Sequence, residues 1–226
     1  IKAEHEKRKA VELNPGGSEE KFMLSSFCSQ FKQHDEAISL SIDAMKLNPL
    51  DENSILKYVS VLFLSRKYQE GLDICNQLIE NEKMKAGAYQ FLFLCHMGLG
   101  QKEEAGSAFG NFLKELGQEE SAIMFFENDF ETAVKKLLED SEFNKDAFLD
   151  RNMYKAQFNC FIGNKEEALK LLYKVCENRE TTITWIRAPW FDFLRDDPRF
   201  VKLYEMAGLK AYDQYLRNRK SFEISV

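Results

Sequence analysis

Apolar residues recur at helical spacing along most of the chain. In residues 19–31 they are Phe22, Met23, Phe27 and Phe31, which return to one helix face after three or four positions. The same period predicts an all-α fold, with helices over residues 2–13, 19–31, 35–47, 52–65, 68–80, 86–97, 102–116, 119–127, 130–140, 145–161 and 165–177.

Three residues are expected to mark helix ends. Ser18 stands where a hydroxyl can cap the helix that follows it. Pro49 forces the residue before it out of the α region, so the preceding helix must stop there. Gly98 is expected to take the left-handed conformation that ends a helix.

Small residues return at a fixed interval of 34 positions, at Ala3, Ala37, Gly71 and Ala105. A constant period of this length is typical of stacked helix pairs. Two helices that cross closely leave no room for a large side chain at the crossing, and forcing one in would cost about 1–3 kcal/mol.

The interval slips after residue 116. Ala133 follows Ala105 by 28 residues, and Ala168 follows Ala133 by 35. We therefore predict a repeat array over residues 1–178, with an irregular unit near 117–144 and a helical cap over 179–226. Residues 1–15 match only the second half of a unit, so we expect the protein to continue upstream.

The repeats resemble the tetratricopeptide repeat (TPR) family. The match lies in Ala37, Ala44 and Pro49 of one unit and in Ala105 and Phe109 of a later one. The resemblance implies a right-handed α-solenoid of TPR-like helix pairs. It also implies a concave groove that binds a protein or peptide segment with apolar anchors.

By the family's positions, the groove residues would be Phe22, Ser26, Ser29, Leu56, Ser60, Phe63, Gln90, Leu94, Met97, Met153 and Gln157. An equally open alternative is that some of these side chains pack within the array. TPR modules that clamp a terminal carboxylate carry lysine and asparagine where this chain has Phe22 and Ser26, which disfavours that subtype.

The segment after the array breaks the period and contains both tryptophans, Trp185 and Trp190. Asp197 followed by Pro198 favours a helix start, and Gly208 favours its end. An array needs a cap over its last apolar face. The cap is expected to use Trp190, Phe191, Phe193, Leu194, Phe200, Leu203 and Leu209.

This segment also resembles a tail that follows TPR arrays in bacterial multi-domain signalling proteins. The matching residues are Pro189, Leu194, Arg195, Asp197, Pro198, Arg199, Phe200, Gly208 and Leu209. The resemblance implies an alternative function, a sensory or regulatory C-terminal module of an adenylate cyclase-like or DNA-binding protein. A capping motif common to many TPR proteins is the other interpretation.

Composition narrows the function classes. The net charge is −6, without the basic footprint of a nucleic-acid binder. No apolar run approaches membrane-spanning length, and the first residues of the given sequence are not expected to act as a signal peptide. Five cysteines without a C-x-x-C pair favour a reducing, cytoplasmic setting.

The sequence contains no recognisable catalytic, metal-binding or phosphate-binding motif. The three histidines lack zinc spacing, and Gly98 and Gly100 lack the strand and lysine of a phosphate loop. We therefore expect no metal, no cofactor and no catalysis in this chain. The sequence favours a non-catalytic protein-binding scaffold that forms the interaction or regulatory part of a larger protein, with an enzyme as the less supported alternative.

Overall fold

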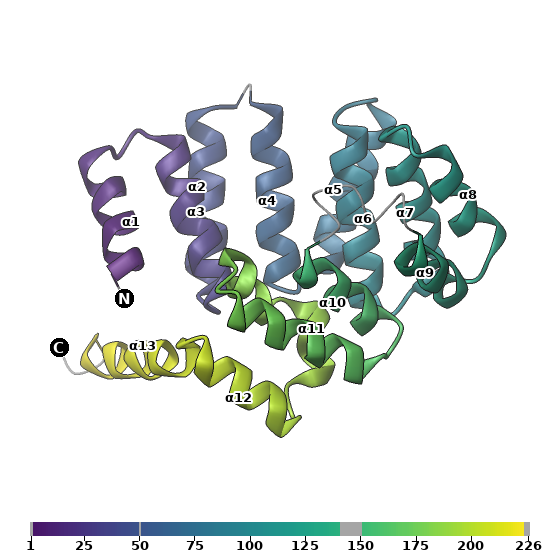
Figure 1. Ribbon diagram of the computed structural model, residues 1–226. Coiled ribbons are helices and arrows are strands. Elements are labelled where there is room, and N and C mark those ends of the chain that lie inside the picture. The colour runs from purple at the N-terminus through teal and green to yellow at the C-terminus, as the bar shows by residue number, and fades with distance from the viewer. Residues whose placement is uncertain (1, 50, 141–150, 224–226) are drawn as a thin grey trace. The chain divides into compact units, whose positions relative to one another are not determined.

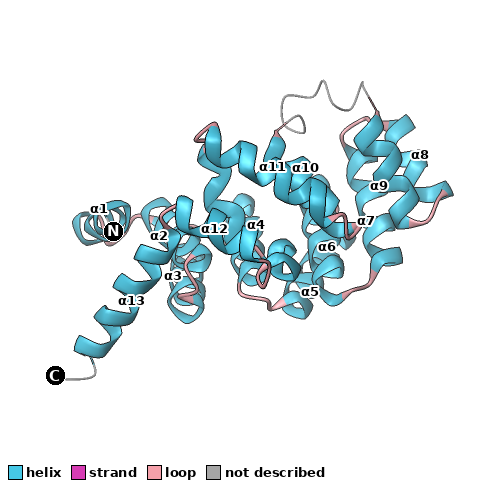
Figure 2. Cartoon of the chain, turned by 60° about the horizontal axis from the view of Figure 1, so that its bottom comes forward, coloured by secondary structure: helices cyan, strands magenta, loops and turns pink. Residues whose placement is uncertain are grey.

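The computed structural model describes residues 2–49, 51–140 and 151–223, which are helical throughout apart from turns and connections. These residues form thirteen α-helices and two 3₁₀ helices and contain no strand (Figures 1 and 2). The chain divides into two compact units, a larger one of residues 7–150 and a smaller one of residues 1–6 with 151–226. The all-α prediction is confirmed.

The larger unit contains most of α1 and the eight helices that follow it. Their bounds are α1 (Lys2–Leu13), α2 (Ser18–Gln30), α3 (His34–Leu47), α4 (Glu52–Leu64), α5 (Tyr68–Glu80), α6 (Lys85–Leu99), α7 (Lys102–Glu115), α8 (Glu119–Glu127) and α9 (Phe130–Glu139). From α2 onward each helix packs on the next, and Figure 1 shows α2 to α7 as rods that follow one another in chain order. In addition α2 packs on α4, α4 on α6 and α7 on α9. The chain is therefore built of sequentially packed helix pairs, as the period predicted.

One turn is repeated at the predicted interval. Lys32, Arg66 and Gly100 each have a positive φ, of 61°, 61° and 76°. The amide of the residue after each one donates a hydrogen bond to the carbonyl five positions back, from Gln33 to Cys28, from Lys67 to Leu62 and from Gln101 to His96. Gly163 in the smaller unit, with a φ of 75°, makes the same turn. Glu82, Gly117 and Arg179 make the same turn after the second helix of a pair, so the 34-residue interval describes the turns within pairs in the larger unit.

Three of the four small residues at the predicted interval are buried between helices. Ala37 and Ala105 are fully buried, and the Ser25 hydroxyl of α2 donates a 2.6 Å hydrogen bond to the Ala37 carbonyl of α3. At Gly71 of α5, an added Cβ would stand 2.9 Å from the Cys95 sulfur of α6. That distance is shorter than normal packing allows, so α5 and α6 approach closely because residue 71 has no side chain. Ala3, by contrast, is exposed.

Aromatic side chains fill the core between α6 and α9. The Phe93 and Phe109 rings lie 4.8 Å apart, and Phe125 meets Phe109 edge-on at 4.9 Å. Phe130 lies 6.3 Å from Phe93. These four rings are buried and hold consecutive helices in the part of the chain where the sequence interval slips.

Two predicted helix ends are wrong. The residue before α2 is Gly17 rather than Ser18, and no side chain caps that helix. Helix α6 continues through Gly98 and ends at Leu99, with Gly100 as its left-handed cap. Gly98 serves packing instead, since an added Cβ there would lie 2.6 Å from the Tyr68 ring.

The smaller unit contains α10 (Asn152–Phe161), α11 (Lys165–Glu177), η2 (Thr181–Arg187), η3 (Pro189–Leu194), α12 (Pro198–Met206) and α13 (Leu209–Glu223). Helix α10 packs on α11 and η3, α11 on η2 and α12, and α12 on α13. Of the residues expected in the cap, five are buried, Trp190 is half-buried and Phe193 is 44% exposed. Residues 145–150 of one predicted helix, 141–144 of the irregular unit and 224–226 of the cap lie outside the described residues.

Candidate binding pocket

A pocket of about 300 Å³ opens between α1, α2 and α4 in the larger unit. Its lining residues are Lys7, Glu19, Phe22, Met23, Ser26, Lys57, Ser60 and Val61. Helix geometry brings them together, because residues three and four positions apart share a face. Phe22 and Ser26 are so related on α2, and Lys57 with Ser60 and Val61 on α4.

The apolar part of the lining is partly buried and partly open. Phe22 and Val61 are almost fully buried, and they form an apolar base. Met23 is 49% exposed beside them. The hydroxyls of Ser26 and Ser60 add small polar groups on the two facing helices. Such a lining suits an apolar side chain whose backbone or neighbours need hydrogen bonds.

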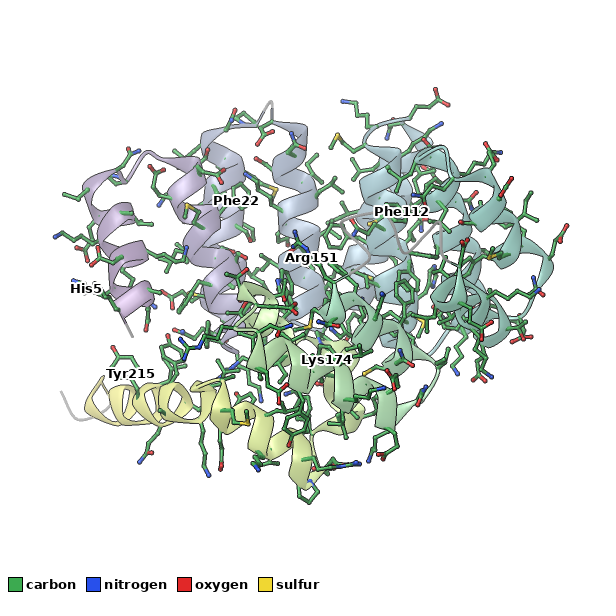
Figure 3. All side chains as sticks on the ribbon, viewed as in Figure 1. His5, Phe22, Phe112, Arg151, Lys174 and Tyr215 are labelled. Carbon is green, nitrogen blue, oxygen red and sulfur yellow. The ribbon has the colours of Figure 1, made fainter. Side chains whose placement is uncertain are left out.

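The charged groups of the pocket are arranged around Phe22, which is labelled on α2 in Figure 3. The Lys57 ammonium lies 2.5 Å from the Glu19 carboxylate and 5.1 Å from the centre of the Phe22 ring. An ammonium over an aromatic face is held by the ring quadrupole as well as by the carboxylate. Lys7 contributes a second ammonium from α1.

The predicted groove residues divide into three groups. Phe22, Ser26 and Ser60 line the pocket. The other eight do not line the pocket. Five of them are buried, namely Ser29, Phe63, Leu94, Met153 and Gln157. Three are half-buried, namely Leu56, Gln90 and Met97.

The five buried residues outside the pocket pack within the fold, as the alternative interpretation of the groove positions expects. Leu56 is also used for packing, because an added Cβ at Gly87 of α6 would lie 2.3 Å from its Cδ1 atom. Met153 and Gln157 belong to α10 in the smaller unit, so the structure does not join them to the pocket.

Five lining residues were not predicted from the sequence as part of a site, namely Lys7, Glu19, Met23, Lys57 and Val61. The period contained a signal for one pair of them. Residue 53 is one interval after Glu19, and Lys57 follows it by one helical turn on the same face. Opposite charges at such positions on consecutive first helices can meet, as these two do.

Two buried cysteines, Cys75 and Cys95, are poor nucleophiles in this fold. Burial raises the pKa of the Cys75 thiol and of the Cys95 thiol to about 12, so both stay protonated at neutral pH. His96, next to Cys95, directs its Nδ1 atom to the Gln101 side chain at 2.7 Å. That contact ties the end of α6 to the start of α7.

Within residues 2–49, 51–140 and 151–223, no three histidine, cysteine or carboxylate side chains gather as a metal would require. None of the described helices has both the length and the apolar character needed to cross a bilayer.

The C-terminal motif is used for folding the smaller unit. The Asp197 carboxylate caps α12 by accepting from the Arg199 amide at 2.9 Å. The Arg199 guanidinium makes paired hydrogen bonds to Glu166 of α11, at 2.7 and 2.8 Å, and also bonds Asp197. Hydrogen bonds from Arg199 lower the pKa of both carboxyl groups. The motif's Asp-Pro-Arg thus starts α12 and fastens it to α11.

A buried arginine joins the remaining parts of that unit. The Arg187 side chain, 1% exposed, lies 2.5 Å from Asp213 of α13 and donates to the Leu209 carbonyl at 3.2 Å. Its guanidinium also stands over the Tyr204 ring, whose hydroxyl donates to Asp213 at 2.7 Å. Arg195 of the motif donates to the Arg187 carbonyl at 2.7 Å. These bonds connect η2, α12 and α13.

Comparison of the chain with protein-family models, with curated proteins and with solved structures finds no match in any of the three.

Proposed function

We propose that this chain is a TPR-like scaffold that binds a peptide segment of another protein and carries out no chemistry itself. The observation that carries the proposal is the pocket between α1, α2 and α4, with an apolar base and a polar edge. Helices α2 and α4 are the first helices of consecutive pairs. In the TPR family such helices line the concave face, which supports the resemblance for α2 and α4. Helix α1, a second helix by the same phase, adds Lys7 to the lining.

The proposal extends to the architecture, a right-handed α-solenoid. It is supported by the turn repeated at Lys32, Arg66 and Gly100 and by the packing of α2 on α4 and of α4 on α6. Contacts between successive repeats of this kind are what stacked units make. A cytoplasmic setting is part of the proposal, and the five free cysteines support it.

Peptide binding accounts for the pocket better than a cofactor does. Its volume of about 300 Å³ lies at the lower end of the range for small-molecule sites, about 300–1,000 Å³. One or two side chains of an extended or helical segment would fill it. Apolar anchors in such pockets supply most of the affinity of small interfaces.

The test is an unbiased selection of short displayed peptides on the full chain, followed by affinity measurement on variants. Ser60→Trp places a large ring in the pocket and is expected to abolish binding of the selected peptides. Ser107→Trp, at an exposed position of α7, is the matched control and should leave binding unchanged. Selected peptides that bind both variants as well as the parent would contradict the proposed site.

A further inference from the structure

The pocket lining is positively charged, whereas the protein as a whole is negatively charged. The protein carries a formal net charge of −6, whereas the pocket lining contains two lysines and one glutamate. The lining is therefore cationic on an acidic protein. Complementary charge is the feature that selects and orients partners at such sites.

The two lysines are held differently. Lys57 already has partners within the protein, since its ammonium lies 2.5 Å from the Glu19 carboxylate and 5.1 Å from the centre of the Phe22 ring. Lys7 lies half-buried on α1, and within the described residues no side chain makes an ion pair or hydrogen bond with it. An ammonium without an ion-pair partner attracts an anion more strongly at the edge of an apolar pocket than it would in bulk water, because the effective dielectric constant is lower there.

We infer that the pocket takes a peptide segment in which a large apolar side chain stands next to an aspartate or glutamate. The apolar side chain packs on Phe22, Met23 and Val61, and the carboxylate pairs with Lys7. This inference rests on the proposed function and names the chemistry of the partner.

The experiment uses three sets of short labelled peptides that share a central leucine or phenylalanine. The neighbouring residue is glutamate in the first set, glutamine in the second and lysine in the third. Fluorescence anisotropy with the full chain is expected to give the tightest binding for the glutamate set, weaker binding for glutamine and the weakest for lysine. Binding of the glutamate set should weaken with added salt.

Two charge-reversal variants of α1 sharpen the test. Lys7→Glu is expected to weaken binding of the glutamate set about tenfold, because one attraction becomes a repulsion. The same variant should strengthen binding of the lysine set. Lys9→Glu makes the same change in net charge at an exposed position two residues along and should leave both affinities unchanged. Circular dichroism checks that each variant folds.

The possible failures are distinct. If all three sets bind equally and Ser60→Trp abolishes binding, the peptide-binding function stands and the acidic preference is wrong. If no set binds and the unbiased selection recovers nothing, both proposals fail. Concentration-dependent self-association that Ser60→Trp abolishes would mean that a second copy of the chain occupies the pocket, which would also overturn the inference.

Discussion

The close crossing of α5 and α6 at Gly71 predicts that alanine at this position is destabilising. A Cβ built on Gly71 lies 2.9 Å from the Cys95 sulfur and 3.8 Å from Val59 Cγ1. The first distance is well inside the optimum for non-bonded atoms, about 3.5–4.0 Å. Cys95 is fully buried and has a short side chain, so its sulfur has little room to move.

The expected magnitude follows from two opposing terms. Overpacking a core costs about 1–3 kcal/mol, and replacing glycine by alanine within a helix gains about 1 kcal/mol. Gly71→Ala should therefore lower the free energy of unfolding by up to about 2 kcal/mol. When Cys95→Ala removes the sulfur, the same substitution should instead raise it by about 1 kcal/mol.

The assay is urea denaturation of the parent, the two single variants and the double variant, which form a double-mutant cycle. Gly106→Ala in α7 is the matched control, because its added Cβ would make an ordinary 3.6 Å contact with Phe130. The control should be stabilised by about 1 kcal/mol. Stabilisation by Gly71→Ala equal to that of the control, with no coupling energy in the cycle, would show that the Cys95 sulfur does not limit the size of residue 71.

Three further predictions concern the smaller unit. Arg179 is exposed and has a φ of 52°, so Arg179→Gly should be more stable to urea than Arg179→Ala by about 1 kcal/mol; equal stabilities would contradict this. Asp213→Ala leaves the buried Arg187 guanidinium without its carboxylate and should lower the free energy of unfolding, measured by thermal denaturation, by about 2–4 kcal/mol. Adding Arg187→Met should restore part of the loss. The pKa of Asp197 is lowered by hydrogen bonds from Arg199, so its stabilising effect is present above the ordinary aspartate pKa of 3.8 and is lost as the pH falls below it. The urea midpoint of the parent should accordingly approach that of Asp197→Asn between about pH 5 and pH 2, because asparagine keeps the cap but lacks the charge that pairs with Arg199. A constant difference would argue against a stabilising Asp197–Arg199 pair.

Helix bounds were predictable from the sequence wherever the apolar period and the turn residues agreed. Helices α1, α5, α8 and α11 begin and end at the predicted residues. Gly98 shows where this reasoning stops. Both Gly98 and Gly100 can end a helix, and the sequence does not show that Gly100 takes the left-handed conformation while Gly98 stays inside α6 against the Tyr68 ring.

The candidate pocket was predicted less completely, because the family's positions fix a helix face only approximately. Neighbouring residues on a helix point about 100° apart, so a small rotation of α4 or α6 separates a groove position from a core position. Phe63 and Leu94 are on the buried side of that boundary, and Ser60 lines the pocket. Glu19 and Lys57 were missed because charged residues on a helix are usually solvated, and their pairing depends on how α2 packs on α4.

The turn that recurs every 34 residues within the helix pairs is the central feature of the repeat architecture. Backbone NMR chemical shifts of the isotope-labelled chain report the sign of φ at each residue and test it directly. We predict positive φ at Lys32, Arg66 and Gly100, as the structure has them. Negative φ at Lys32 or Arg66 would mean that the helix pairs do not share a turn, and would contradict the repeat architecture.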